Sequence, residues 1–244
     1  MDTSRYSQLF RQTCHALFIS TLLATVSSTL LFSSVSSADK DKQTNNFALG
    51  VGVGTTGLSL NGTFQLSDHF NIRGIYANYD FSENDTESGI AYQFDIELDT
   101  FSLLLDWHPS ADSGFRISLG GVNNGTNFSA KTTQTSGNIT VGNSSFSASD
   151  IGTINAKVDY DRFAPYIGIG WGNAVRQDQS LSFALDIGVI GMSDANINLT
   201  SRGTNATIQS VLDTQLEIEK RELESSLDGF DLYPVVNLSL AYRF

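Results

Sequence analysis

Strict alternation of apolar residues with small or polar residues is the dominant pattern from residue 47 to the C-terminus. In residues 181–189, every second position is Leu, Phe, Ile or Val, and the positions between them are Ser, Ala, Asp or Gly. A period of two is typical of β-strands that present one face to an apolar environment. The segments with this pattern are 47–54, 58–66, 115–121, 163–172, 181–190 and 234–244.

Two further segments, 69–81 and 90–107, alternate in the same way but change phase. In 90–107, Phe94, Ile96 and Leu98 share one parity, whereas the apolar residues from 101 to 107 share the other. A β-bulge near Asp99–Thr100 would reconcile the two halves and turn the acidic residues before it to the inside. A similar shift is expected near Arg73–Gly74. The acidic residues that the bulge near Asp99–Thr100 would turn to the inside are Asp95, Glu97 and Asp99.

The first 38 residues have the features of a secretory signal peptide. Arg5 and Arg11 precede a mostly apolar run over 16–32, and the small residues Ser36 and Ala38 fit a cleavage site before residue 39. A transmembrane anchor is the alternative. After Ala38 no apolar run approaches 18 residues, so the expected mature domain, 39–244, could enter a membrane only as a closed β-barrel.

The two faces of the strands and the lengths of their connections indicate a membrane barrel. Many small residues on the less apolar face would leave a soluble core hollow, so we expect the apolar face to contact lipid. Short links follow residues 66, 107 and 172, and longer ones lie at 82–89, 132–153 and 200–230. Short periplasmic turns and long outer loops are typical of the bacterial outer membrane. The predicted fold is all-β, an eight-stranded antiparallel transmembrane β-barrel.

One segment, 205–228 in the last long loop, has helical periodicity. Asn205 is a plausible N-cap and Gly229 a plausible stop. The predicted amphipathic helix could rest on the barrel mouth, act as a lid or plug, or bind a partner. Its apolar positions are Ile208, Val211, Leu212, Leu216, Leu223 and Leu227.

The stretches FAPYIGIGWG (163–172) and LSLAYRF (238–244) resemble small bacterial outer-membrane barrels of the OmpW-like and OmpA-like superfamily. The resemblance implies the fold and the outer-membrane location. It also implies that Tyr242 and Phe244 form the C-terminal signal that the barrel-assembly machinery recognises. Such barrels include passive channels, adhesion or surface proteins and a few lipid-modifying enzymes.

Composition narrows the functional classes. The chain carries 14 Lys and Arg against 26 Asp and Glu, a net charge of −12, which argues against nucleic-acid binding. The single cysteine, Cys14, excludes a disulfide framework and a Cys-based zinc site. We expect His69 and His108 to be exposed turn residues. The sequence therefore predicts no catalytic, cofactor-binding or metal-binding residues.

The charged residues expected to face the lumen are the most informative polar positions. Asp106, Arg116 and Arg243 should lie near the periplasmic end and Asp186 further along the barrel. Charges in a narrow lumen must pair or contact water, so a charge network is predicted. It could be a structural salt-bridge plug or a cation-preferring constriction. The acidic loop 82–87 is expected to be solvated, with weak divalent bridging to lipopolysaccharide as the alternative.

The function that we expect is that of a structural or surface outer-membrane protein without catalysis. A narrow channel for small or hydrophobic solutes is the alternative, and an outer-membrane lipid-modifying enzyme is the third class. The expected partners are outer-membrane lipids and the assembly machinery, and the expected state is a monomer without cofactors.

Overall fold

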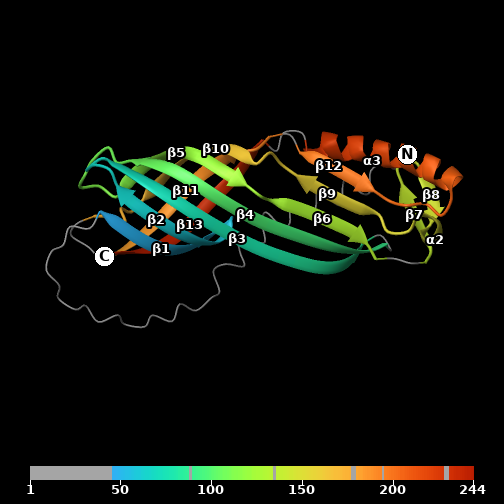
Figure 1. The fold of residues 1–244 in the computed structure, drawn as a ribbon, viewed down its shortest axis with the longest axis horizontal. Coiled ribbons are helices and arrows are strands. Elements are labelled where there is room, and N and C mark those ends of the chain that lie inside the picture. The colour runs from blue at the N-terminus through green and yellow to red at the C-terminus, as the bar shows by residue number, and fades with distance from the viewer. Residues whose placement is uncertain (1–45, 88–89, 134–135, 177–179, 194, 228–230) are drawn as a thin grey trace.

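The computed structural model describes residues 46–87, 90–133, 136–176, 180–193, 195–227 and 231–244. The expected signal peptide and the expected helix stop at Gly229 lie outside these residues. Within them, eight antiparallel strands close a ring, because β1 pairs with both β2 and the last strand, β13 (Figure 1). The ring order is β1 (Phe47–Gly54), β2 (Gly57–Gln65), β3 (Phe70–Glu87), β4 (Ile90–Trp107), β5 (Phe115–Asn124), β10 (Phe163–Trp171), β11 (Leu181–Gly191) and β13 (Leu232–Arg243). The predicted eight-stranded antiparallel barrel is confirmed.

The outer surface of the ring is a continuous apolar belt. Leu58 is 71% exposed, Phe163 76% and Trp171 62%. On each strand these outward residues alternate with residues that point inward. Such exposure of large apolar side chains is typical of a lipid-facing surface. The nine residues of β10, at roughly 3.3 Å per residue and a tilt of roughly 40°, give the belt a height of about 20 Å.

The expected bulges in β3 and β4 are wrong. The two strands pair without interruption from Phe70 opposite Trp107 to Glu87 opposite Ile90. The even-numbered residues of β4 face inward from Tyr92 to Asp106, and Phe94, Ile96 and Leu98 are therefore buried. The same set of alternate residues therefore faces inward throughout β4, and what changes along the strand is whether its outer face contacts lipid or water. In the belt the apolar residues face outward to lipid, and beyond it they face inward to an apolar core, as in a soluble protein. Consequently the acidic residues of this half lie on the outer side, with Glu97 and Asp99 exposed and Asp95 half-buried.

Beyond the belt, β3 and β4 continue into an outer unit that the sequence did not predict. β4 leaves β5 and pairs with β6 (Asn127–Thr132), which pairs with β9 (Asn155–Asp159) and then β12 (Asn196–Thr200) (Figure 1). The segment 82–89 is thus largely strand and not a long loop. At the far end lie the hairpin β7 (Asn138–Val141) and β8 (Ser144–Ser147), the short helix α2 (Ala148–Ile151) and helix α3 (Ala206–Leu227).

Helix α3 packs its apolar side against this far end. Leu212 and Leu216 join Ile139 and Ile151 in one buried cluster, which connects the helix to β7 and α2. The Asn205 side chain accepts a hydrogen bond from the Ile208 amide at 3.0 Å and so caps the helix as predicted. Val211 is 45% exposed and does not belong to the buried side. None of the described helices has the length and apolarity needed to span a bilayer.

Candidate functional site

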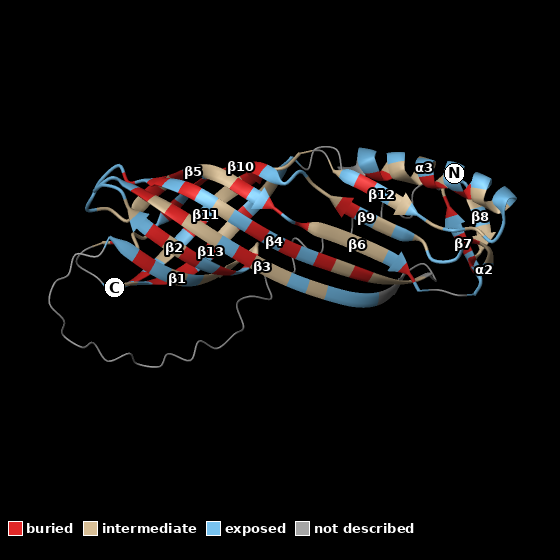
Figure 2. Cartoon of the chain, in the orientation of Figure 1, coloured by how far each residue is buried: buried red, intermediate tan, exposed pale blue. Residues whose placement is uncertain are grey.

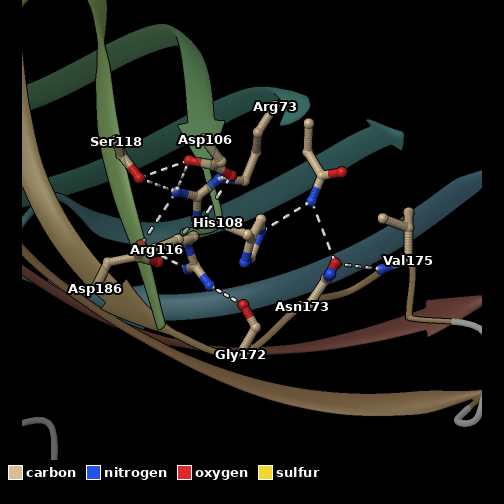
Figure 3. Close-up of polar contacts among 10 residues, drawn as sticks. Arg73, Asp106, His108, Arg116, Ser118, Gly172, Asn173, Val175 and Asp186 are labelled. Atoms are coloured by element: carbon tan, nitrogen blue, oxygen red, sulfur yellow. Dashed lines mark hydrogen bonds and ion pairs between the residues drawn. The ribbon is translucent and has the colours of Figure 1, made fainter. Parts of the chain in front are cut away.

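The turn end of the barrel, where the short links lie, encloses a network of four charged side chains (Figure 3). Arg73 lies between two carboxylates, with Nε 2.9 Å from Asp106 Oδ2 and Nη1 2.9 Å from Asp186 Oδ2. Arg116 Nη2 lies 2.6 Å from Asp186 Oδ1, and Ser118 Oγ donates to Asp106 Oδ1 at 2.5 Å. All five residues are buried, so the network joins β3, β4, β5 and β11 across the lumen.

Two arginines and two aspartates make the network electrically neutral. Neutrality matters here because an unpaired charge in a low-dielectric interior is strongly unfavourable. A second hydrogen bond joins Arg116 to the carbonyl oxygen of Gly172, directly after β10. Gly172 has a backbone φ of +118°, a conformation that residues other than glycine rarely adopt. A fifth ring strand is therefore connected to the network.

The structure brings together three of the four residues predicted for the lumen network, Asp106, Arg116 and Asp186. Arg243 occupies an inward position at the end of β13 but is partly exposed there, and the described ion pairs of Asp106 run to Arg73 and Arg116. Sequence reasoning missed Arg73 because it placed a phase shift at that residue. Unbroken alternation, with Asn71, Arg73 and Ala77 all buried on one face of β3, would have found it.

A second polar layer closes the turn end beneath the charges. The Asn71 Nδ2 group donates to His108 Nε2 at 3.1 Å and to Asn173 Oδ1 at 3.2 Å, and Asn173 Oδ1 also accepts from the Val175 amide. His69 Nδ1 donates to the His108 carbonyl oxygen at 2.8 Å. His108 is 1% exposed, so the expectation that it is an exposed turn residue is wrong; His69 is exposed. His108 therefore has a structural role: it contacts His69 and Asn71, and Asn71 extends the layer to Asn173.

The half of the lumen farther from the turns is filled by apolar side chains. Leu104, Val122, Ile190 and Val235 pack together with Tyr166 from five strands. The Tyr166 hydroxyl would lie 2.5 Å from a Cβ atom at either of two paired glycines, Gly168 and Gly188. The PY-x-G-x-G sequence therefore has a packing explanation, since an aromatic ring covers two positions that lack side chains.

Two small cavities lie beside these layers in the part of the lumen that the structure describes. One cavity of about 30 Å³ touches Asp186, Tyr166 and Asn237 between the charged and apolar layers. A second, of about 10 Å³, lies above it beside Thr126 and Met192. A cavity needs roughly 10–15 Å³ to hold one water molecule, so the two spaces accommodate a few waters.

The C-terminal aromatic residues lie on the apolar belt at the turn end. Tyr242 is 46% exposed and Phe244 57%, and their rings meet edge to face with centroids 5.3 Å apart. Phe244 also stacks on Phe47 of the first strand at 6.5 Å. Within the described residues no group of three His, Cys, Asp or Glu side chains is arranged to hold a metal ion.

Comparison with solved structures shows the fold. The chain is similar to CarO of Acinetobacter baumannii, with 19% identity, a TM-score of 0.54, and coverage of 84% of this chain and 100% of that one. It is also similar to CarO2 of the same organism, with 19% identity, a TM-score of 0.52, and coverage of 82% and 99%. No protein-family model matches the chain, and no curated protein matches it. The architecture is that of small bacterial outer-membrane barrel proteins.

Proposed function

We propose that this chain is an outer-membrane surface protein whose barrel is a sealed, non-catalytic anchor for the outer unit. The observation that carries the proposal is that two different layers occupy the lumen in series, the neutral charge network at the turn end and the apolar layer above it. A transport pathway has no need of two seals in series. The outer unit, in contrast, has its own buried clusters and is held on continuous strands.

The proposed location is the outer membrane, reached after cleavage before residue 39. The turn end then faces the periplasm, where β1 begins and β13 ends, and the outer unit faces the medium. Tyr242 and Phe244 lie exposed at the end of β13, where the assembly machinery would bind them before ring closure. In this proposal the folded protein is a monomer surrounded by lipid.

Conductance in planar bilayers tests the sealed barrel. We expect no stable conductance from the folded wild-type protein. The double variant R73S/R116S should also remain closed because the apolar layer persists, and Y166A/I190A should remain closed because the charge network persists. Only the quadruple variant should conduct. Steady conductance of the wild type, or of the charge variant alone, would contradict the proposal.

A narrow channel for small solutes is the second candidate, and one observation favours it. On the wall formed by β1, β2 and β13 the inward residues are small, and two buried atoms there, Asn61 Oδ1 and Asn237 Nδ2, have no protein hydrogen-bond partner. Buried polar groups are usually hydrogen-bonded, so bound water is expected along this wall. The conductance of the wild-type protein in planar bilayers decides between the two: steady conductance would indicate a solute pathway along this wall, and no conductance would indicate bound water in a closed barrel.

The proposed absence of catalysis is tested separately, by the chemistry of the surrounding lipid. Lipid A mass should be unchanged when the protein is expressed in a heterologous outer membrane. A new acylated or deacylated lipid A species that disappears with the protein would assign it to the enzyme class.

A further inference from the structure

The outer half of β3 is a free sheet edge in the part of the chain that the structure describes. β2 pairs with β3 only from Gln65 opposite Asn71 to Leu58 opposite Asn78, whereas β4 pairs with β3 as far as Glu87. In Figure 1 this stretch forms the lower margin of the outer unit, and Figure 2 shows it largely exposed. Unpaired strand edges are natural sites for the addition of another strand.

The backbone groups of three residues point to this open edge. The Asn78 carbonyl faces β2, since it lies 2.3 Å from the position that a Cβ of Gly57 would occupy. The N–H and C=O groups of every second residue in a strand point to the same side. Asp80, Ser82 and Asn84 therefore direct their donors and acceptors beyond the end of β2, and all three are exposed.

The two faces beside this edge differ in chemistry. On the inner face, Tyr79 and Phe81 are stacked with ring centroids 6.4 Å apart and only half-buried at the margin of the apolar cluster of Phe94 and Ile96. On the outer face the exposed Asp80 lies opposite the exposed Glu97. Like charges directly opposite one another are unfavourable in a sheet, and a cation nearby would relieve them.

We propose that this edge binds an extended polypeptide segment in which basic and apolar residues alternate. The inference rests on the proposed surface role and specifies its partner. The partner strand would pair with the edge amides, cover Tyr79 and Phe81 with its apolar side chains, and place its lysines or arginines beside Asp80 and Glu97. A second copy of this chain fits poorly, because two β3 edges would bring Asp80 and Glu83 against the same acidic residues.

The test uses the full mature chain folded in detergent micelles and a heptapeptide of alternating lysine and valine. Binding should slow amide hydrogen exchange at Asp80, Ser82 and Asn84 at least tenfold. The amides of Tyr79 and Phe81, which already bond to β4, should change little. A peptide of alternating glutamate and valine should have no effect. Unchanged exchange at millimolar lysine–valine peptide would overturn the proposal, as would equal protection by both peptides.

A pair of variants at Ser82 separates strand addition from simple charge attraction. S82P removes the outward N–H without removing a bond to β4, whereas S82A keeps it; both lose the hydroxyl contact with Asp95. Peptide affinity should fall tenfold or more in S82P and stay within twofold of wild type in S82A, with heat-modifiable gel mobility confirming that both fold. Equal peptide affinities of S82P and S82A would refute strand addition. A concentration-dependent dimer that protects the same amides would refute the proposed peptide partner. If the peptide does not bind the β3 edge and the barrel does not conduct, this inference is refuted but the proposed function is unaffected.

Discussion

Removing the central arginine of the lumen network should strongly destabilise the barrel. The Arg73 side chain is 5% exposed and pairs with two carboxylates that are equally buried. In R73M one negative charge in the lumen has no compensating cation, since Arg116 remains as the single arginine for Asp106 and Asp186. Breaking a buried ion pair by removing one partner typically costs about 3–5 kcal/mol, and we expect the free energy of unfolding to fall by that amount.

The double variant R73M/D106N restores neutrality and tests the electrostatic origin of the loss. The pair between Arg116 and Asp186 at 2.6 Å remains intact. We therefore expect the free energy of unfolding to return to within about 2 kcal/mol of wild type. R243M is the matched control, because this arginine is partly exposed at the barrel rim and exposed pairs contribute about 0–1 kcal/mol.

Urea unfolding in lipid vesicles measures these differences. Both tryptophans of the chain, Trp107 and Trp171, lie on the lipid-facing belt, so their emission shifts to the red when the barrel leaves the bilayer. A loss below about 1 kcal/mol in R73M would show that the network contributes little to stability. A double variant no more stable than R73M would show that packing of the arginine, and not its charge, is what matters.

Three further predictions concern the outer unit, and the second and third are measured by hydrogen exchange of the α3 amides. L212A, at a fully buried position of the α3 cluster, should cost about 2–5 kcal/mol and expose the β7–β8 hairpin to limited proteolysis, while urea unfolding of the barrel stays unchanged. N205A should cost about 1 kcal/mol and speed exchange in the first turn of α3, with the last turn unaffected. Burial raises the pKa of Glu219, aided by Glu222 and opposed by the Gly142 amide, so docking of α3 should strengthen as pH falls through that raised pKa. E219Q should abolish this pH dependence, and a pH response that persists in E219Q would assign it to another group.

The barrel could be predicted from the sequence because lipid imposes a simple rule on each strand. Six of the eight strands show one uninterrupted alternation, and their predicted ranges lie close to the observed ones. The rule fails where a strand leaves the membrane, since water reverses which face is apolar. Phe94 and Ile96 point inward there, and the reversal resembles a bulge when only the sequence is read.

The same error determined what could be predicted of the candidate site. Asp106, Arg116 and Asp186 lie in regular segments and their inward orientation follows from parity, whereas Arg73 lies at a false phase shift. The burial of His108 could not be predicted from the sequence pattern, because His108 follows the last residue of β4. It is enclosed by residues distant in the chain, such as His69 and Asn71. The short strands β6, β9 and β12 have only five or six residues each, with weak alternation, and their pairing becomes evident only in three dimensions.

The unbroken pairing of β3 with β4 has a mechanical consequence. Two 18-residue strands, at roughly 3.3 Å per residue, form a ribbon close to 60 Å long that is anchored at one end in bilayer and projects at the other into solution. Because the β3–β4 ladder has no bulge or hinge, a pull on the outer ends of both strands is transmitted to the ring, where the hydrogen bonds of β3 with β2 and of β4 with β5 are loaded in shear together. Tension applied to the outer unit would thus be delivered to the ring as a whole, and Glu87 and Ile90 would keep a fixed height above the lipid headgroups.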